Sequence, residues 1–226
     1  MKKVALSWSG GKDAAMALYT LLQDNSVEVK CLFTTIYKPL NRVSMHGVPF
    51  HLIKKQIEAV GIEWIPMYIE NKTNQHYEKA LTETLIELKE KFEITHFAFG
   101  DIFLEDLKQY REQQLQKVGL EAIFPIWKQD TSQLAKKVLQ LGFKTKICCI
   151  DLSKIPEALI DYDYSEAFLN QLPKDVDPCG ENGEFHTFCY DGPVFSKEVV
   201  FKANGTTIKS YENNGTKYQF KFYDLT

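Results

Sequence analysis

The sequence predicts an α/β fold, in which a Rossmann-like, mostly parallel sheet flanked by helices precedes a smaller α+β region that ends in a β-hairpin. Short β-prone runs alternate with amphipathic helical stretches as far as about residue 151, and this alternation requires βαβ crossovers. Beyond that point the alternation ends. Two strand-like runs between 199 and 223 surround Asn213-Asn214-Gly215, a typical hairpin turn. We therefore expect one domain at 1–151 and a smaller region at 152–226.

The first region contains segments rich in Val, Ile, Thr and aromatic residues, which is the composition of strands. They lie at 3–8, 27–37, 62–69, 94–99, 120–126 and 143–150. Between them, apolar residues recur at helical spacing in segments that begin after Asp13 and at Pro49, Gln75, Leu104 and Thr131. These segments predict helices on both faces of a parallel sheet.

The helix that begins near Pro49 has recognisable ends. Pro49 suits the first turn of a helix and Gly61 its C-terminal cap, and residues 52, 53, 56, 57 and 60 mark one face between them. In the second region we expect two short helices at 156–162 and 165–171, followed by a polar, glycine-bearing segment at 177–192.

Composition limits the classes of function. The net charge of −3 argues against a chain whose whole surface binds nucleic acid, and no apolar run approaches the ~20 residues of a membrane span. The apolar run at the N-terminus stops at Ser9, too early for a signal peptide, so we expect a cytoplasmic protein. The five cysteines form no C-x-x-C pair, which indicates neither a disulfide framework nor a zinc site. The sequence does not choose between a monomer and a homodimer.

The loop Ser9-Gly10-Gly11-Lys12-Asp13 carries the strongest chemical signal. It lies between the first predicted strand and the first predicted helix, where open α/β sheets bind ligands. Two glycines expose successive backbone N–H groups, the helix N-terminus adds partial positive charge, and Lys12 adds a full one. The loop therefore predicts a phosphate site.

Two common phosphate loops are excluded. A Walker A loop needs a glycine five residues before Gly11, where Leu6 stands, and a hydroxyl after the lysine, where Asp13 stands. The dinucleotide pattern G-x-G-x-x-G is also absent. The S-G-G-K-D sequence resembles the loop of the PP-loop ATP pyrophosphatases, whose fold is of the adenine nucleotide alpha hydrolase type. That resemblance implies attack on the α-phosphorus of ATP and release of pyrophosphate. A plain strand-to-helix turn is the alternative.

The resemblance extends over nearly the whole chain to the diphthine–ammonia ligase family (the domain of unknown function 71 group). The most specific part is Gly180-Glu181-Asn182-Gly183-Glu184, followed by Phe185 and by Thr187. The matching stretches, in the family's order, are 7–13, 45–48, 99–102, 119–122, 125–127, 179–188 and 191–195. The resemblance makes 1–151 the ATP-binding PP-loop domain and 152–226 the substrate side.

The reaction that this resemblance implies begins with adenylation of a carboxylate, that of diphthine, a modified histidine of elongation factor 2. Ammonia then displaces AMP and leaves an amide. Two positions depart from the family pattern. Ala14 stands where the family has a serine near the phosphates, and Asn182 stands where it has a glycine. Asn tolerates the left-handed conformation better than most residues, so we expect the turn to be kept. The family also has members without the diphthamide pathway, whose substrates are open, with a link to cobalamin metabolism suggested for some.

The expected ATP site combines the loop with two later strand ends. Its residues are Ser7, Ser9, Gly10, Gly11, Lys12, Asp13, His46, Gly47 and Gly100. Asp13 would hold Mg²⁺ directly or through water, because this cation keeps much of its hydration. Its alternative role is to cap the first helix. A lone loop histidine such as His46 is often only a structural hydrogen-bonding group.

The expected catalytic residues are Lys12, Asp13, Asp101, Glu181 and Glu184. Asp101 would bind metal or position ammonia, or else cap the following helix. A carboxylate can hold ammonium or take its proton.

The expected acceptor site is made of Glu181, Gly183, Glu184, His186 and Thr187, among which Glu184 and His186 share a face if the segment is extended. The alternative is a polar turn that only packs the two regions together. Arg111 and Glu112 are interpreted as surface or salt-bridge residues, and Cys179 as a thiol without a visible base.

Two functions other than an amide-forming ligase are compatible with the phosphate loop. A tRNA thiolase or lysidine-type enzyme of the same superfamily needs a cysteine pair or a basic extension, and neither is present. A binding module that senses ATP or AMP without turnover is favoured only by the hydroxyl lost at Ala14. The sequence predicts ATP, Mg²⁺, ammonia and an acceptor carboxylate as ligands, with no membrane or nucleic-acid partner.

Overall fold

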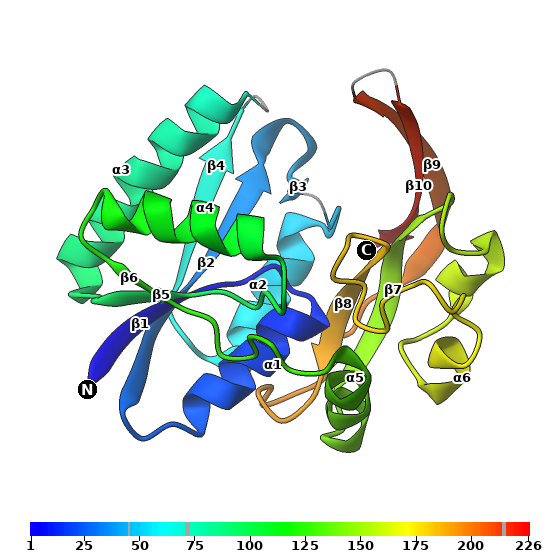
Figure 1. Ribbon diagram of the computed structural model, residues 1–226, viewed down its shortest axis with the longest axis horizontal. Coiled ribbons are helices and arrows are strands. Elements are labelled where there is room, and N and C mark those ends of the chain that lie inside the picture. The colour runs from blue at the N-terminus through cyan, green and yellow to red at the C-terminus, as the bar shows by residue number, and fades with distance from the viewer. Residues whose placement is uncertain (45, 71–72, 214–215) are drawn as a thin grey trace.

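The first sheet carries the parallel strands that the sequence predicts. The computed structural model describes residues 1–44, 46–70, 73–213 and 216–226 (Figure 1). Among these, parallel strands follow the order β6-β5-β1-β2-β4, and the short β3 pairs antiparallel with the end of β2. Their bounds are β1 Lys2–Ser7, β2 Val27–Tyr37, β3 Arg42–Val43, β4 Trp64–Ile69, β5 His96–Ala98 and β6 Glu121–Ile123. The predicted Rossmann-like sheet is confirmed.

Helices cover both faces of this sheet, and β1 shows how the two cores separate. Val4 and Leu6 pack in the core that includes helices α1 and α2, whereas Ala5 packs with α3 and α4 on the other face. Successive side chains of a strand point to opposite faces, so an apolar run is needed where both faces are covered. The bounds are α1 Lys12–Leu22, α2 Phe50–Val60, α3 Asn74–Phe92, α4 Glu105–Gln116 and α5 Thr131–Gln140. No described helix is long and apolar enough to span a membrane.

A second, antiparallel sheet follows the order β8-β7-β10-β9. Its strands are β7 Lys144–Asp151, β8 Phe185–Asp191, β9 Ala203–Asn213 and β10 Thr216–Leu225. The expected terminal hairpin is present, because Asn213 pairs with Thr216; residues 214 and 215 of the predicted turn lie outside the described residues. Short helical turns occur at η1 Lys38–Leu40, η2 Glu157–Asp161 and α6 Glu166–Leu169.

β7 lies in a different sheet from the one that the sequence predicted. The run 143–150 was expected in the parallel sheet, but β7 pairs antiparallel with β8 and β10. Its buried, apolar composition suits either sheet, and both of its partners come later in the chain. The polar, glycine-bearing segment expected at 177–192 contains β8, so part of it is extended. We therefore propose that the chain divides between β6 and α5, rather than at residue 151.

The two sheets are joined beside the loop at 9–13. Cys189 of β8 donates its backbone N–H to the carbonyl of Gly10 at 2.8 Å. Gln56, on the buried face of α2, donates to the same carbonyl at 2.9 Å and to that of Cys189. The indole N–H of Trp8 donates to Oε1 of Gln56 at 3.1 Å. This buried amide therefore links β1, the loop and β8.

Replacing Gln56 with alanine is expected to destabilise the fold by roughly 3 kcal/mol, since it leaves several buried polar groups without partners. Chemical denaturation of the Gln56→Ala variant measures the loss. Gln133→Ala is the matched control, because Gln133 is exposed on α5 and should change stability by less than about 0.5 kcal/mol. Equal stability of the two variants would contradict the bridging role of Gln56.

Candidate functional site

The loop between β1 and α1 has the backbone of an anion site. Gly10 has a φ of 81°, and a Cβ there would lie 2.6 Å from Oε1 of Gln56, so both conformation and space require glycine. Gly11 is the N-cap of α1 and offers no side-chain cap. Its N–H reaches the Ser9 hydroxyl at 3.3 Å, and the N–H of Lys12 donates to the Thr187 hydroxyl at 3.0 Å. A helix N-terminus without an aspartate cap is open to a phosphate.

Lys12 is buried and paired with its neighbour. Its Nζ lies 2.8 Å from each carboxylate oxygen of Asp13, and it also donates to the carbonyl of Cys179. The rings of Tyr164 and Phe185 lie 5.4 Å from the ammonium group. Burial is the largest single influence and lowers the pKa of Lys12, but the charge and hydrogen bond of Asp13, together with Cys179 and Glu181, outweigh it, and the pKa is raised. The ammonium group therefore stays charged at neutral pH.

The structure gathers most of the predicted site residues around one cavity of about 190 Å³, which we call the phosphate cavity. Predicted residues that line it are Ser7, Ser9, Lys12, Asp13, His46, Gly100, Asp101, Glu181, Gly183, His186 and Thr187. They come from the ends of β1 and β5, from the first turn of α1, from the loop after β3, and from the turn before β8 and that strand itself. Gly10 and Gly11 support the loop behind it, while Gly47 and Glu184 do not line this cavity.

Gly100 and Glu181 hold the walls of the phosphate cavity together. A Cβ at Gly100 would lie 2.9 Å from the carbonyl of Asp13, so glycine lets the end of β5 approach α1. Glu181 accepts the backbone N–H of Ile102 at 2.7 Å and that of Phe103 at 3.3 Å. Burial raises the pKa of Glu181 to about 7, helped by Asp13 and Asp101 and opposed by the two N–H groups. Glu181 can therefore gain or lose a proton near neutral pH.

Stability should depend on the ionisation of Glu181. Its pKa is raised from 4.5 to about 7, so the folded chain binds this proton more tightly and loses stability as the pH rises between those values. Allowing for solvent screening, the loss is about 1 kcal/mol, or 2–4 °C in Tm. The Glu181→Gln variant should lose less stability than the wild type between pH 5 and pH 8.

Thermal melting at the two pH values measures the difference, with Glu90→Gln on the exposed face of α3 as the control. A Glu181→Gln variant with the same pH dependence as the wild type would contradict the raised pKa.

Asp101 forms a salt bridge with Arg111, which the sequence predicted to be a surface or salt-bridge residue. Oδ2 of Asp101 lies 2.6 Å from Nε of Arg111, whose guanidinium group stacks 4.2 Å from the centre of the Phe99 ring. Asp101 does not cap α4, because the N-cap is Leu104 without a side-chain hydrogen bond. Arg111 also lines the phosphate cavity, so it is a salt-bridge residue, as one of the two predictions had it, and not simply a surface residue. The sequence contained a sign of this inward position: Arg111 lies four residues from both Leu107 and Leu115, so the three side chains share one helix face.

The rings of His46 and His186 contact one another at one end of the phosphate cavity, with centroids 4.4 Å apart and planes tilted by 38°. Burial lowers the pKa of His186 to about 4, and burial, His186 and Lys12 hold the pKa of His46 well below its usual value. Both rings are therefore neutral at pH 7. Nδ1 of His46 is buried and has no hydrogen-bond partner among the described residues.

Glu184 supports the turn instead of the cavity. It is buried, and its Oε1 accepts the side-chain amide of Asn182 at 3.0 Å and the N–H of Asp177 at 3.3 Å. Glu184 therefore does not share a cavity with His186. The left-handed positions of this turn are Gly180 and Gly183, so Asn182 needs no left-handed conformation; its side chain instead holds Glu184.

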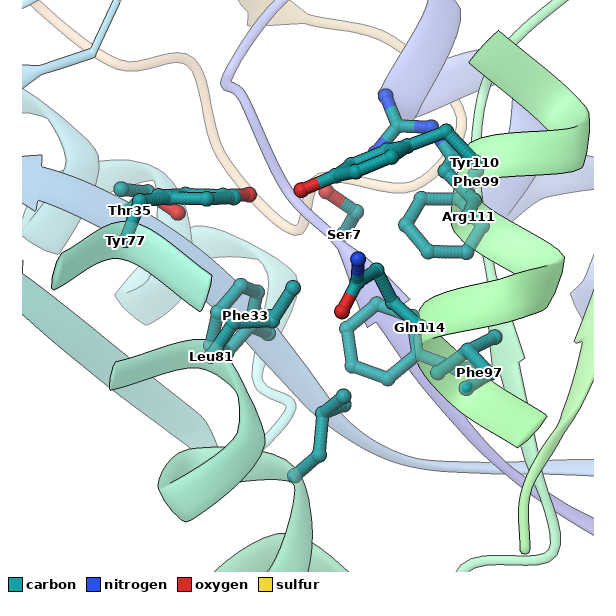
Figure 2. Close-up of a pocket in the computed structure, with 12 residues that line it drawn as sticks. Ser7, Phe33, Thr35, Tyr77, Leu81, Phe97, Phe99, Tyr110, Arg111 and Gln114 are labelled. Carbon is teal, nitrogen blue, oxygen red and sulfur yellow. The ribbon is translucent and has the colours of Figure 1, made fainter. Parts of the chain in front are cut away.

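A smaller cavity of about 40 Å³ adjoins the phosphate cavity between the ends of β1, β2 and β5 and helices α3 and α4. Ser7, Phe99 and Arg111 line both cavities. Figure 2 shows the hydroxyl groups of Tyr77 and Tyr110, which line this cavity, pointing toward one another. The two tyrosines would have to move apart to admit a planar ring.

Carboxylates, which are the usual protein ligands of a hard cation, line the phosphate cavity. Asp13, Asp101 and Glu181 bring carboxylates close enough that Asp13 and Asp101 raise the pKa of Glu181. No group of three or more His, Cys, Asp or Glu side chains in the described part of the chain could enclose a metal. Mg²⁺ is usually held with nucleotides by one or two carboxylates, phosphate oxygens and water, and Asp13 offers such a carboxylate.

Family models match both parts of the chain. The model of the diphthamide synthase N-terminal domain matches residues 1–122, and that of the diphthamide synthase C-terminal domain matches residues 130–221. The human protein named diphthine–ammonia ligase is 24% identical over 248 residues, covering 99% of this chain and 91% of the human protein. The rat protein of the same name is 25% identical over 232 residues, covering 92% and 86%.

Among solved structures, the U34-tRNA thiolase NcsA from Methanococcus maripaludis, determined with its 4Fe-4S cluster, aligns with this chain at a TM-score of 0.37 and 17% sequence identity. The alignment covers 62% of this chain and 57% of the thiolase.

Proposed function

The chain belongs to the diphthamide synthase family, and on that premise we propose that it is an ATP-dependent, amide-forming ligase. In the proposed reaction an acceptor carboxylate attacks the α-phosphorus of ATP, pyrophosphate leaves, and ammonia then displaces AMP from the acyl-adenylate. The observation that carries the proposal is that Ser9, Lys12 and Asp13 of the loop line the same cavity as Glu181 and His186.

We propose that the β- and γ-phosphates bind at the loop. The N-terminus of α1 and the charged Lys12 favour an anion there, and Gly10 and Gly11 let the backbone approach it closely. The small cavity beyond Ser7 and Phe99 is our candidate for the base of ATP, once Tyr77 and Tyr110 separate. This orientation would turn the α-phosphorus toward the middle of the phosphate cavity.

Charge stabilisation at the α-phosphate is the main requirement of the first step. Lys12 supplies a fixed positive charge, and the neutral rings of His46 and His186 each carry one N–H donor. Mg²⁺, held by Asp13 and phosphate oxygens, would neutralise further charge on the pyrophosphate.

The second step needs ammonia without its extra proton. We propose that Glu181 accepts that proton, because its pKa near 7 lets it serve as a base at neutral pH. The N–H groups of Ile102 and Phe103 hold its carboxylate in place. Asp101, fixed by Arg111, is the second carboxylate near this position.

Two classes of acceptor are candidates. The curated relatives are named diphthine–ammonia ligase, so diphthine on elongation factor 2 is the first candidate. A small-molecule carboxylate, for example in cobalamin-linked metabolism, is the second. Ala14 lines the phosphate cavity without a hydroxyl, and it favours a third reading, a module that binds ATP without turnover.

Product analysis tests the proposal. The protein is incubated with ATP, Mg²⁺, ammonium and diphthine-bearing elongation factor 2, with each component omitted in turn. We expect AMP, pyrophosphate and an amidated acceptor only in the complete mixture. ADP and phosphate would rule out adenylation, whereas ATP binding without any product on either class of acceptor would favour the non-catalytic module.

A further inference from the structure

Arg111 lies where the phosphate cavity meets the small cavity of about 40 Å³ beyond it. Ser7, Phe99 and Arg111 line both cavities, and Figure 2 labels all three. Lys12 lines the phosphate cavity alone. In the part of the chain that the structure describes, Arg111 is therefore the one lysine or arginine at this junction.

Three contacts fix the guanidinium group of Arg111. Its Nε lies 2.6 Å from Oδ2 of Asp101, and its Nη2 donates to Oδ1 at 3.1 Å. The central carbon of the group lies 4.2 Å from the centre of the Phe99 ring, so an aromatic ring supports it as well. A ligand can therefore bind this group without first ordering a long side chain, which lowers the entropic cost of binding.

Part of this guanidinium group remains for a ligand. A guanidinium group carries N–H groups on all of its nitrogens, and Asp101 occupies the edge formed by Nε and Nη2. Nη1 has no hydrogen-bond partner among residues 1–44, 46–70, 73–213 and 216–226. Arginine donors arranged in this planar way suit the oxygens of a phosphate group.

The proposed position of ATP decides which phosphate lies at the junction. With the base in the small cavity and the β- and γ-phosphates at the loop at 9–13, the ribose and the α-phosphate must cross between the two cavities. Lys12 is held at the loop by Asp13 and by the carbonyl of Cys179, so it serves the other end of the triphosphate. The α-phosphate is then the phosphate nearest to Arg111.

We propose that Arg111 binds a non-bridging oxygen of the α-phosphate, both in ATP and in AMP, and that Asp101 is the positioning residue that holds it there. This inference rests on the proposed function for the nucleotide and the reaction. In the first step, a bond forms between the acceptor oxygen and the α-phosphorus. The bond from that phosphorus to the bridging oxygen breaks, and its electron pair leaves with pyrophosphate. The N–H groups of Arg111 stabilise the charge on the α-phosphate during this exchange and hold the acyl-adenylate afterwards.

Binding of AMP and adenosine to the full chain tests this inference without turnover. The two ligands differ only in the α-phosphate, and both need Tyr77 and Tyr110 to separate, so the ratio of their Kd values reports the contacts of that phosphate. By isothermal titration calorimetry, we expect the wild type to bind AMP at least about 10-fold more tightly than adenosine. The Arg111→Met variant should bind AMP about 10- to 100-fold more weakly than the wild type, with adenosine changed less than about twofold.

Pyrophosphate with Mg²⁺ is the complementary probe, because it presents the two phosphates that the proposed function places at the loop. Arg111→Met should weaken AMP more than pyrophosphate, and Lys12→Met should weaken pyrophosphate more than AMP. A loss of packing at Arg111 alone would not produce this crossed pattern.

Lys108→Met is the matched control for Arg111→Met. Lys108 lies on the same helix, and its side chain is 24% exposed, as is that of Arg111, but it lines neither cavity. This variant loses a positive charge from α4 and should still bind AMP and adenosine as the wild type does.

A second substitution covers the case in which Arg111→Met does not fold, since it leaves the carboxylate of Asp101 without its partner. Arg111→Lys keeps the charge beside Asp101 but not the planar group. We expect it to bind AMP more weakly than the wild type and to leave adenosine unchanged. Thermal melting of each variant shows that it is folded at the temperature of the titration.

These outcomes separate the inference from the proposed function. If AMP binding depends on Arg111 but the complete reaction mixture gives no amide, the inference stands and the proposed reaction fails. If the wild type forms the amide and a folded Arg111→Met variant binds AMP as the wild type does, the reaction stands and the inference is overturned. It is also overturned if the wild type binds AMP no more tightly than adenosine, or if the folded Arg111 variants weaken both ligands equally.

Discussion

Replacing Lys12 with methionine is expected to lower the rate of pyrophosphate release from ATP about 1000-fold. Methionine keeps much of the length and volume of the side chain but removes the charge beside the loop at 9–13. That charge is buried, so no other cation or solvent molecule replaces it easily. A steady-state assay of pyrophosphate with saturating acceptor measures the effect.

The control for Lys12 is Lys136→Met, on the exposed face of α5, which should keep wild-type activity. Because removal of Lys12 leaves the carboxylate of Asp13 without its partner, thermal melting must show that the variant is folded at the assay temperature. Lys12→Arg, which keeps the charge, should retain more activity than Lys12→Met. Comparable rates for Lys12→Met and the wild type would show that the phosphates bind elsewhere.

The second large effect is expected for Glu181→Gln, which should slow amide formation about 100- to 10,000-fold. Glutamine can still accept the N–H groups of Ile102 and Phe103, so the turn is kept, but it cannot take a proton from ammonium. Acceptor-dependent exchange of labelled pyrophosphate into ATP should continue, because adenylation precedes that proton transfer. Rapid-quench measurement of the two half-reactions separates them.

The pH profile gives an independent readout for Glu181. In the wild type, amide formation should rise as Glu181 loses its proton near pH 7, and the Glu181→Gln variant should lack this rise. Glu90→Gln should keep the wild-type profile. If Glu181→Gln slows adenylation and amide formation equally, its role is to hold the cavity wall and not to move the proton.

Local patterns in the sequence were sufficient for the first sheet and the phosphate loop. The strand at 2–7 and the helix after it are adjacent in the chain, and the two glycines between them are required by conformation and contact in the structure. Gln56 was visible as a polar residue on an apolar helix face. Its partners, Trp8 and Cys189, could not be read from that pattern, because one lies far earlier and the other far later in the chain.

Long-range pairing accounts for what the sequence did not predict. The composition of β7 indicates a strand, but its antiparallel partners are set by segments that follow it by tens of residues. Glu184 and Glu181 belong to one motif, yet one side chain is buried in the turn and the other lines the phosphate cavity. The position of Arg111 between the two cavities follows only from where α4 lies relative to the ends of β1 and β5.

Transfer of ¹⁸O from the acceptor to AMP tests the central claim most directly. The acceptor carboxylate is labelled with ¹⁸O, and the protein is allowed to complete one turnover with ATP, Mg²⁺ and ammonium. If the carboxylate attacks the α-phosphorus, one ¹⁸O atom per amide formed must appear in AMP, since ammonia breaks the carbon–oxygen bond of the acyl-adenylate. Mass spectrometry of AMP should show this label. Unlabelled AMP, or label found in inorganic phosphate, would contradict adenylation of the acceptor.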